Sequence, residues 1–239
     1  MTTLKLEARA LDMLRTACTF AAVDDCRYYI NAVCIEVNVT RCRVMATDSH
    51  AMFVGSISAY EGLELPKTDL LLNAVHLKEA LAAFKAKRDL VALEITFDDA
   101  ALEEEKKNNC IGETDIKASF TAVYSVKPKE KGAPRSFEKK EAPKTALITL
   151  GRIVEYKRVI PIPDAATQPL SDQSLNPRLL EKISRAAISL NDSTLPALTF
   201  TTAGASSAVV TPLAPDAIAV VMPMRPGEYS YRSAYNKIF

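Results

Sequence analysis

The chain has 239 residues, 48% of them apolar, which is enough to bury the core of one large domain or two smaller ones. Lysine and arginine number 30 against 29 aspartates and glutamates, and this balance excludes a strongly basic nucleic-acid coat and an acidic disordered tail. No apolar run approaches the roughly 20 residues of a bilayer span. Residues 1–7 lack the apolar centre of an export signal, so we expect a folded cytoplasmic protein without a membrane partner.

Five cysteines are spread along the chain without a C-x-x-C pair: Cys18, Cys26, Cys34, Cys42 and Cys110. The first four recur at a step of eight residues, which crosses from a helix to a strand and places no two metal ligands on one turn. We therefore expect reduced thiols, no metal and no other cofactor.

The order of the predicted elements repeats along the chain, and the first copy runs strand, helix and three strands. Strands are predicted over residues 3–6, 42–46 and 52–57, a helix over 7–22, and alternating strand residues over 28–39. This copy sets the pattern for the others.

The second copy follows Pro66 in the same order. The periodicity predicts a strand over 69–72, a helix over 75–87 and strands over 91–98, 116–124 and 145–150.

Two polar insertions interrupt the second copy, at residues 103–115 and 126–144. The second insertion holds six lysines, one arginine and three glutamates. Such a segment buries little apolar surface, so we predict a mobile hairpin tip or loop.

A third, shorter copy begins with a helix at Asn176, where Pro177 takes a first helical position that needs no N–H donor. Strands are predicted over 197–202, 205–212 and 217–224, and the proline-bounded segment 161–169 precedes the copy as a domain connector. Three such copies indicate an α+β fold in which helices cover one face of antiparallel sheets.

Basic side chains lie on all three predicted helices. They form one stripe on the third helix and a weaker one on the second, while acidic neighbours offset them on the first. A solvated polar face explains any one helix, but repetition in three copies favours a shared surface that faces phosphates. The eight residues are Arg9, Arg15, Lys78, Lys85, Arg88, Arg178, Lys182 and Arg185.

No pattern predicts an enzyme, and we assign no catalytic residue. Asp48, Ser49 and His50 are consecutive, so they cannot adopt the relay geometry of a catalytic triad. The acidic pair at 24–25 and the three glutamates at 103–105 are predicted to lie in loops as solvated charge.

Six segments, in their order along the chain, resemble the bacterial DNA polymerase III β subunit, the sliding clamp. The resemblance covers about residues 8–225 and implies a DNA-clamp fold. It divides the chain into a complete clamp-like domain at 1–164, half a domain at 165–225, and a tail at 226–239. The six segments are Arg27–Ala32, Ala46–His50, Tyr156–Pro161, Asn176–Leu180, Gly204–Ser207 and Val220–Arg225.

The resemblance also implies a cleft between the two domains that accepts short peptides from polymerases, clamp loaders and repair proteins. Flexible Met222 and Met224 suit a leucine and an aromatic side chain of the peptide, and His50, Arg158 and Asn176 suit its polar end. The residues matched to this cleft are Ile30, Thr47, Ser49, His50, Ala51, Met52, Arg158, Val159, Asn176, Leu179, Ala205, Ser207, Val220, Val221, Met222, Pro223, Met224 and Arg225.

The chain departs from the family at three of these positions, Ser49, Ala51 and Met52, where glycine, arginine and leucine are common. Nothing in the sequence resembles the family's first domain or the other half of its third.

Two functions are therefore open. The first is a sliding-clamp-like processivity factor whose basic helices face double-stranded DNA without reading its sequence, and which forms a tetramer or a dimer. The second is an interaction protein that never encircles DNA and competes for the peptides that bind the host clamp, or adapts one of their proteins. The end of the tail, Tyr235–Phe239, faintly resembles such a peptide.

Overall fold

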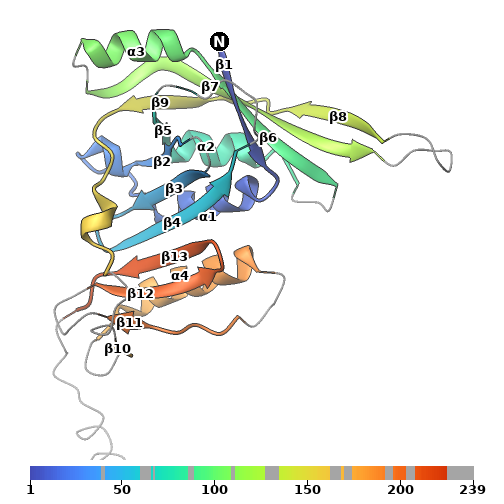
Figure 1. Cartoon of the computed structure of the whole chain (residues 1–239). Helices are drawn as coiled ribbons and strands as arrows, with labels where there is room; N and C mark the ends of the chain where they lie inside the picture. The colour runs from blue at the N-terminus through green and yellow to red at the C-terminus, as the bar shows by residue number, and fades with distance from the viewer. Residues whose placement is uncertain are drawn as a thin grey trace, which may run out of the picture. The chain divides into compact units, whose positions relative to one another are not determined.

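The computed structural model describes residues 1–38, 41–59, 66, 68–85, 89–108, 111–126, 135–161, 168–169, 174–191, 196–202 and 208–224. The chain divides into two compact units, Met1–Val154 (unit 1) and Glu155–Phe239 (unit 2). Figure 1 shows their elements in chain order.

Unit 1 holds nine strands and three α-helices among its described residues. The strands are β1 (Thr2–Glu7), β2 (Ala32–Glu36), β3 (Arg41–Thr47), β4 (Ala51–Ser58), β5 (Leu70–Asn73), β6 (Leu90–Phe97), β7 (Gly112–Val126), β8 (Ser136–Glu141) and β9 (Ala146–Leu150). The helices are α1 (Ala10–Phe20), α2 (Ala74–Leu81) and α3 (Asp99–Lys107), with a 3-10 turn, η1 (Tyr28–Ile30).

Unit 1 is built from two copies of one topology. In one sheet β1 pairs with β6, β6 with β7, and β7 with β8. In the other, β5 pairs with β2, β2 with β3, and β3 with β4. All pairs are antiparallel. The order β1-β6-β7-β8 of the first sheet corresponds strand by strand to the order β5-β2-β3-β4 of the second.

The two sheets join at both ends. β7 pairs with β6 and β8 over its second half and with β9 over its first, and β9 pairs with β5. A single bridge between Leu6 and Ala59 joins β1 to the end of β4. The strands of unit 1 therefore leave few open edges.

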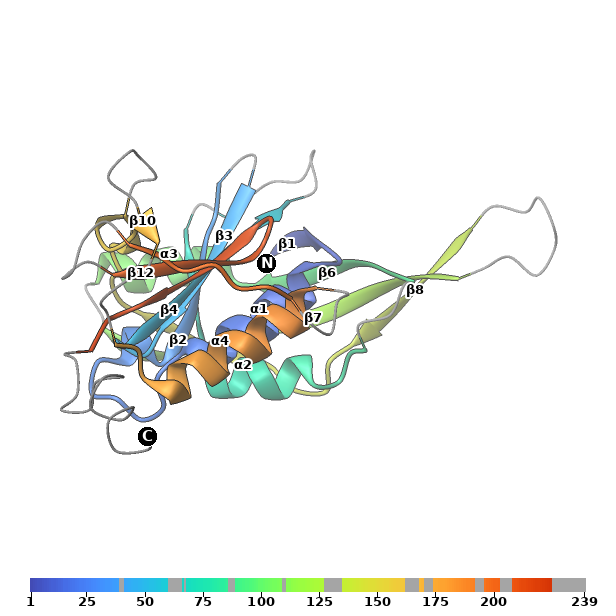
Figure 2. The same ribbon diagram turned by 90° about the horizontal axis from the view of Figure 1, so that it is seen from below.

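The core of unit 1 lies between the sheets and the pair α1 and α2. α1 packs on β2, β3 and β4, α2 packs on β5 and β9, and the two helices contact each other. Figure 2 shows them on the same face of the sheets. Leu11, Leu14 and Phe20 of α1 are fully buried, and the rings of Phe20 and Phe53 lie 5.7 Å apart. The predicted α+β fold, with helices on one face of antiparallel sheets, is confirmed.

Unit 2 repeats the pattern on a smaller scale, with the antiparallel order β13-β12-β11-β10 and one helix that packs on β12. The helix begins as predicted, because the Asn176 side chain accepts a hydrogen bond from the Arg178 amide and Pro177 is its first residue. The elements are η2 (Tyr156–Arg158), β10 (Gln168–Pro169), α4 (Pro177–Leu190), β11 (Thr201–Thr202), β12 (Val209–Ala214) and β13 (Ala217–Val221).

Several predicted elements need correction. Residues 28–30 form a 3-10 turn rather than a strand, and α1 begins at Ala10 rather than at residue 7. The segment 161–169 is not purely a connector, because β10 gives the third copy the leading strand that the sequence did not reveal. Residues 205–207, the start of the strand predicted over 205–212 in the third copy, lie outside the described residues.

The two polar insertions also hold regular structure. The first contains most of α3, which begins where the Asp98 carboxylate accepts from the Ala101 amide and which buries Leu102. Glu103, Glu104 and Glu105 therefore lie on a helix, not in a loop. The second contains β8, which pairs with β7. Of the two predicted structures, a hairpin tip or a loop, the hairpin is therefore the one present.

Candidate functional site

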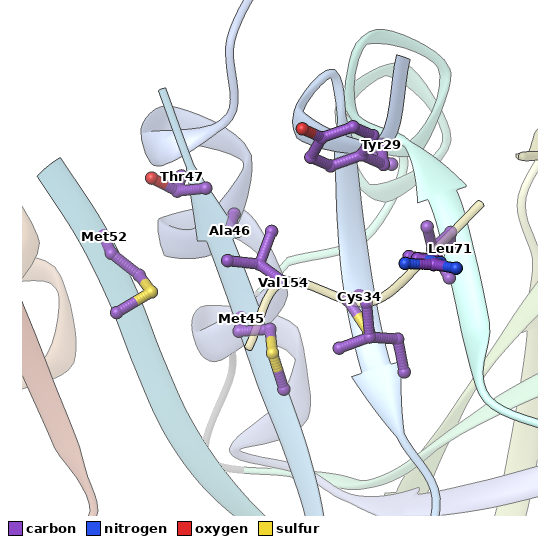
Figure 3. Close-up of a pocket in the computed structure, with 11 residues that line it drawn as sticks. Tyr29, Cys34, Met45, Ala46, Thr47, Met52, Leu71 and Val154 are labelled. Atoms are coloured by element: carbon purple, nitrogen blue, oxygen red, sulfur yellow. The ribbon is translucent and has the colours of Figure 1, made fainter. Parts of the chain in front are cut away.

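A small hollow, partly open to solvent, lies on the face of the β5-β2-β3-β4 sheet that points away from α1. A Cβ on Gly55 would lie 2.8 Å from the Met13 sulfur of α1, so Gly55 faces the helix. Its neighbour Val54 then faces the other way, together with its cross-strand partner Met45. The segment 152–154 crosses this outer face and closes one side of the hollow, as Figure 3 shows.

The floor of the hollow is apolar and rich in sulfur. Cys34 and Met45 face each other across β2 and β3, and Met52 follows on β4. All three side chains are at most 6% exposed. Burial raises the pKa of the Cys34 thiol, so it stays neutral and is a packing group rather than a nucleophile. The lining residues are Tyr29, Ala32, Cys34, Met45, Ala46, Thr47, Met52, Leu71, Arg152, Ile153 and Val154.

This surface suits one apolar side chain of a ligand, since methionine and cysteine adapt to irregular shapes. The rim is polar, with Thr47 half-buried and Arg152 exposed. Of these lining residues, only Thr47 and Met52 were predicted from the sequence to belong to the peptide cleft. Alternation along the predicted strands could have added Cys34 and Met45, but nothing in the sequence shows that residues 152–154 cross the sheet.

The β3–β4 turn beside the hollow is fixed by two side chains. The Thr47 hydroxyl donates to the Ala51 carbonyl oxygen (2.9 Å) and accepts from the Ser49 amide (3.1 Å). The Asp48 carboxylate accepts from the amides of His50 (2.9 Å) and Ala51 (2.8 Å). Ser49 adopts a φ of +74°, which is left-handed backbone, and the turn leaves His50 exposed.

The turn is held by these backbone contacts of the Asp48 carboxylate. It is a rigid corner that presents His50 next to Thr47.

The other matched residues of unit 1 are mainly structural. Ile30 is 3% exposed, and its carbonyl oxygen accepts from the Ala22 amide. Ala51 is 2% exposed and packs within β4.

Nine matched residues belong to the described part of unit 2. Asn176 caps α4, Leu179 is buried, and Val220 and Val221 are buried in β13. Beyond β13, the large side chains of Met222 and Met224 are 47% and 52% exposed. The remaining three are Arg158, exposed and 2.6 Å from the Glu155 carboxylate, and the half-buried Val159 and Pro223. Ala205, Ser207 and Arg225 lie outside the described residues.

The basic residues of the helices fall into two groups. Lys78, Lys85 and Arg178 expose their side chains. Arg15 instead donates from Nη2 to the carbonyl oxygens of Leu81 and Phe84, both at 2.7 Å, and thereby binds the C-terminal end of α2. These contacts make Arg15 a structural link between the two helices.

The other four basic residues differ in their surroundings. Arg185 pairs with Glu181 on α4 at 2.6 Å. Arg9 and Lys182 are half-buried, and Arg88 lies outside the described residues.

Paired strand–helix–three-strand copies, with both helices on one face of antiparallel sheets, define a DNA-clamp fold. No protein-family model and no curated protein sequence matches the chain. Solved structures do match, and all those compared below are bacterial sliding clamps, so the resemblance noted from the sequence is confirmed at the level of the fold.

The DNA polymerase III β chain of Streptococcus pneumoniae TIGR4 matches with a TM-score of 0.60 and 14% identity over 95% of this chain and 65% of that one. A Pseudomonas aeruginosa sliding clamp matches with a TM-score of 0.58 and 17% identity over 94% of this chain and 66% of that one. The clamp of Bartonella birtlesii gives 0.56 and 14% over 94% and 66%. This chain therefore spans about two thirds of the length of each clamp.

The described residues contain no group of three or more His, Cys, Asp or Glu side chains that could hold a metal ion. Of the helices within the same ranges, none has the length and apolar character needed to cross a bilayer.

Proposed function

We propose that this chain is a sliding-clamp-like processivity factor that tethers a polymerase or other proteins to double-stranded DNA without catalysing a reaction. The observation that carries the proposal is the structural likeness to sliding clamps over 94–95% of the chain. A tether of this kind acts by raising the local concentration of its partner at the DNA.

The DNA-facing surface in this proposal is formed, within each unit, by its helices, and is called the helical face below. The exposed Lys78 and Lys85 of unit 1 and the exposed Arg178 of unit 2 supply sequence-independent phosphate contacts. Arg15 supports this surface indirectly, because it holds α1 against the end of α2.

The partner-binding surface in this proposal is apolar. In unit 1 the hollow accepts an apolar side chain of a short peptide, and the exposed His50 beside it contacts the polar end. In unit 2 the exposed Met222 and Met224 offer flexible apolar contacts. Polymerase and clamp-loader-type proteins are the partners that carry such peptides.

Retention on DNA tests the first part. The protein is incubated with a nicked circular plasmid and with the same plasmid linearised, and the bound fraction is measured by gel filtration. A topological tether stays on the circle and leaves the linear form, and the triple variant Arg178→Glu, Lys182→Glu, Arg185→Glu loses retention. The matched control reverses the exposed Lys107 of α3 to Glu and keeps retention. Equal retention by the triple variant and wild type would contradict the DNA-facing assignment.

Fluorescence anisotropy with a labelled synthetic peptide that contains Leu-Phe tests the second part. The double variant Met222→Ala, Met224→Ala and the single variant Met45→Glu should each weaken binding at least about tenfold, because an apolar contact is lost or replaced by charge. Circular dichroism checks that each variant is folded. Unchanged binding in the folded double variant would remove the methionines from the site.

The contacts that two basic side chains make within the protein favour the second candidate, a protein that binds the same peptides without encircling DNA. Arg15 donates to two backbone carbonyl oxygens and Arg185 pairs with Glu181, so fewer basic side chains of the helices are available to phosphates than the sequence suggests. Light scattering over a concentration series separates the two. An assembly well above the chain mass of 26.1 kDa supports the tether, and a persistent monomer with intact peptide binding supports the competitor.

A further inference from the structure

The strand β8 presents an open edge on the surface of unit 1. All six of its residues are exposed, and among the described strands it pairs with β7 alone. Figures 1 and 2 both show β8 and the second half of β7 projecting away from the helices and the other strands of unit 1. Such an edge offers unpaired backbone donors and acceptors to an incoming strand.

The phase of the ladder identifies the groups that point outward. The Ala142 amide donates to the Phe120 carbonyl oxygen at 2.9 Å, while the Ser125 amide points to the other side of β7 and donates to Asp89. Bonded and non-bonded pairs alternate in an antiparallel ladder. It follows that Phe137, Lys139 and Glu141 direct their backbone N–H and C=O groups to the open edge.

Three lysines fix this edge to the body of unit 1. Lys139 donates to the Glu94 carboxylate at 2.7 Å, Lys140 to the Ala83 carbonyl oxygen at 2.7 Å, and Lys144 to the Glu79 carboxylate at 2.9 Å. The strand is therefore ordered before any partner arrives, so pairing costs little conformational entropy.

We propose that β8 pairs antiparallel with β8 of a second copy of this chain, around a twofold axis at Lys139. In this register Glu138 of each copy lies opposite Lys140 of the other, and Phe137 lies opposite Glu141. Opposite charges directly across a ladder stabilise the pair. The four-stranded sheet β1-β6-β7-β8 then continues into its counterpart in the second copy.

The charge pattern selects this register over its neighbours. An axis at Glu138 places two Glu138 carboxylates opposite each other, and its ion pair joins Glu141 to Arg135, which lies outside β8. An axis at Lys140 places two Lys140 side chains opposite each other. Its ion pair would join Glu141 to Lys139, which already pairs with Glu94. At the Lys139 axis the only like charges placed opposite each other are the two Lys139 side chains, each of which pairs with Glu94 of its own copy at 2.7 Å. This axis also creates two new Glu138–Lys140 pairs.

The interface is small, because one strand pair buries far less than the roughly 800 Å² per partner of a standard interface. We therefore expect a dimer that forms at high concentration or next to another contact. The interface uses neither the hollow nor the helical face, so it is independent of the proposed function.

Disulfide trapping tests the register. A cysteine replaces each residue from 136 to 141 in turn in the full chain. The exposed Cys26, and Cys110, which lies outside the described residues, are both changed to Ala to remove background. Residues that face each other across a bonded antiparallel pair have Cα atoms about 5.5 Å apart, within the range of a disulfide. Lys139→Cys should give a cross-linked dimer at least about fivefold faster than Glu138→Cys or Lys140→Cys. Equal rates, or a maximum at another position, would overturn the proposal.

Charge exchange and edge blocking test the contact without cysteines, by sedimentation equilibrium at high concentration. Glu138→Lys and Lys140→Glu should each weaken dimerisation, and the double variant should restore it, because the opposite pairs reappear with reversed sign. Phe137→Pro removes one outward N–H while keeping the bonds to β7, and should abolish the dimer, whereas Phe137→Thr should keep it. A double variant as weak as the singles, or a dimer that survives Phe137→Pro, would refute the pairing. Retention on circular DNA reports separately on the proposed function.

Discussion

The two copies within unit 1 share one topology and differ in what joins their last two strands. In the first copy the seven-residue β3 turns directly into β4 through Asp48–His50. In the second, β7 has 15 residues, and its far half projects with β8 as a hairpin. The same fold thus forms a rigid corner beside a hollow in one copy and an open strand edge in the other. Connection length, rather than strand order, decides which surface each copy offers.

The two helices show a second difference at equivalent places. α1 has 11 residues, and its Arg15 turns inward to bind the end of α2. α2 has eight residues, is capped by Asn73, and exposes Lys78 to solvent. The two equivalent helices therefore differ in role. The basic residue of α1 holds the helix pair together, and that of α2 is exposed to solvent.

The largest difference between the copies should appear in their last strands. Phe53 of β4 is fully buried and packs against Phe20, whereas Phe137 of β8 is 62% exposed. Phe53→Ala should lower the free energy of unfolding by about 3–5 kcal/mol, and Phe137→Ala should change it by less than about 0.5 kcal/mol. Urea denaturation followed by circular dichroism measures both. Similar losses for the two variants would mean that β8 is buried in solution.

The helix comparison gives the next effect. Arg15→Ala removes two charge-assisted hydrogen bonds to the end of α2 and should cost about 1.5–3 kcal/mol. Lys78→Ala, the matched exposed residue on α2, should leave stability unchanged and weaken DNA retention. If Lys78→Ala destabilised the fold as much as Arg15→Ala, the division between the helices would be wrong.

The turn of the first copy gives a smaller effect of opposite sign. Ser49 holds a φ of +74°, where glycine is free of the steric cost that other residues meet. Ser49→Gly should raise the free energy of unfolding by up to about 1 kcal/mol, after the extra chain entropy of glycine is subtracted. Thermal unfolding compared with Ser49→Ala, which keeps the strain, checks the cause.

The smallest effect concerns a carboxyl group on α1. Burial raises the pKa of Asp12, and Arg15 and Arg9 only partly oppose this. A raised pKa in the folded state means that the ionised form lowers stability, and that this loss disappears as the pH falls below the ordinary value of 3.8. Asp12→Asn should therefore be more stable than wild type at pH 7 and equal to it at pH 3. An advantage that grew toward acid pH would contradict the assignment.

The sequence predicted most strands and the strand–helix–three-strand repeat, because alternation and helical periodicity report burial directly. It failed where local signals were weak. The two-residue β10 is too short to show alternation, and the charged residues of α3 masked a helix that depends on the Asp98 cap and on Leu102.

Part of the candidate site was also within reach of the sequence. Thr47 and Met52 were named from the resemblance, but the segment 152–154 reaches the sheet only through tertiary packing. The inward turn of Arg15 was equally hidden, because its two acceptor carbonyl oxygens lie 66 and 69 residues away in the chain.

The strand order of unit 1 also determines when each strand can pair during synthesis. Thr2–Glu7 leaves the ribosome before the rest of unit 1, yet its main partner β6 ends at Phe97, and β5 meets β9 only at Ile148. Pairings of such long sequence separation form slowly, and incomplete chains expose unpaired strands. All residues up to Phe97 must therefore emerge before β1 is covered, which makes the nascent chain most exposed to aggregation in the interval between residues 7 and 97.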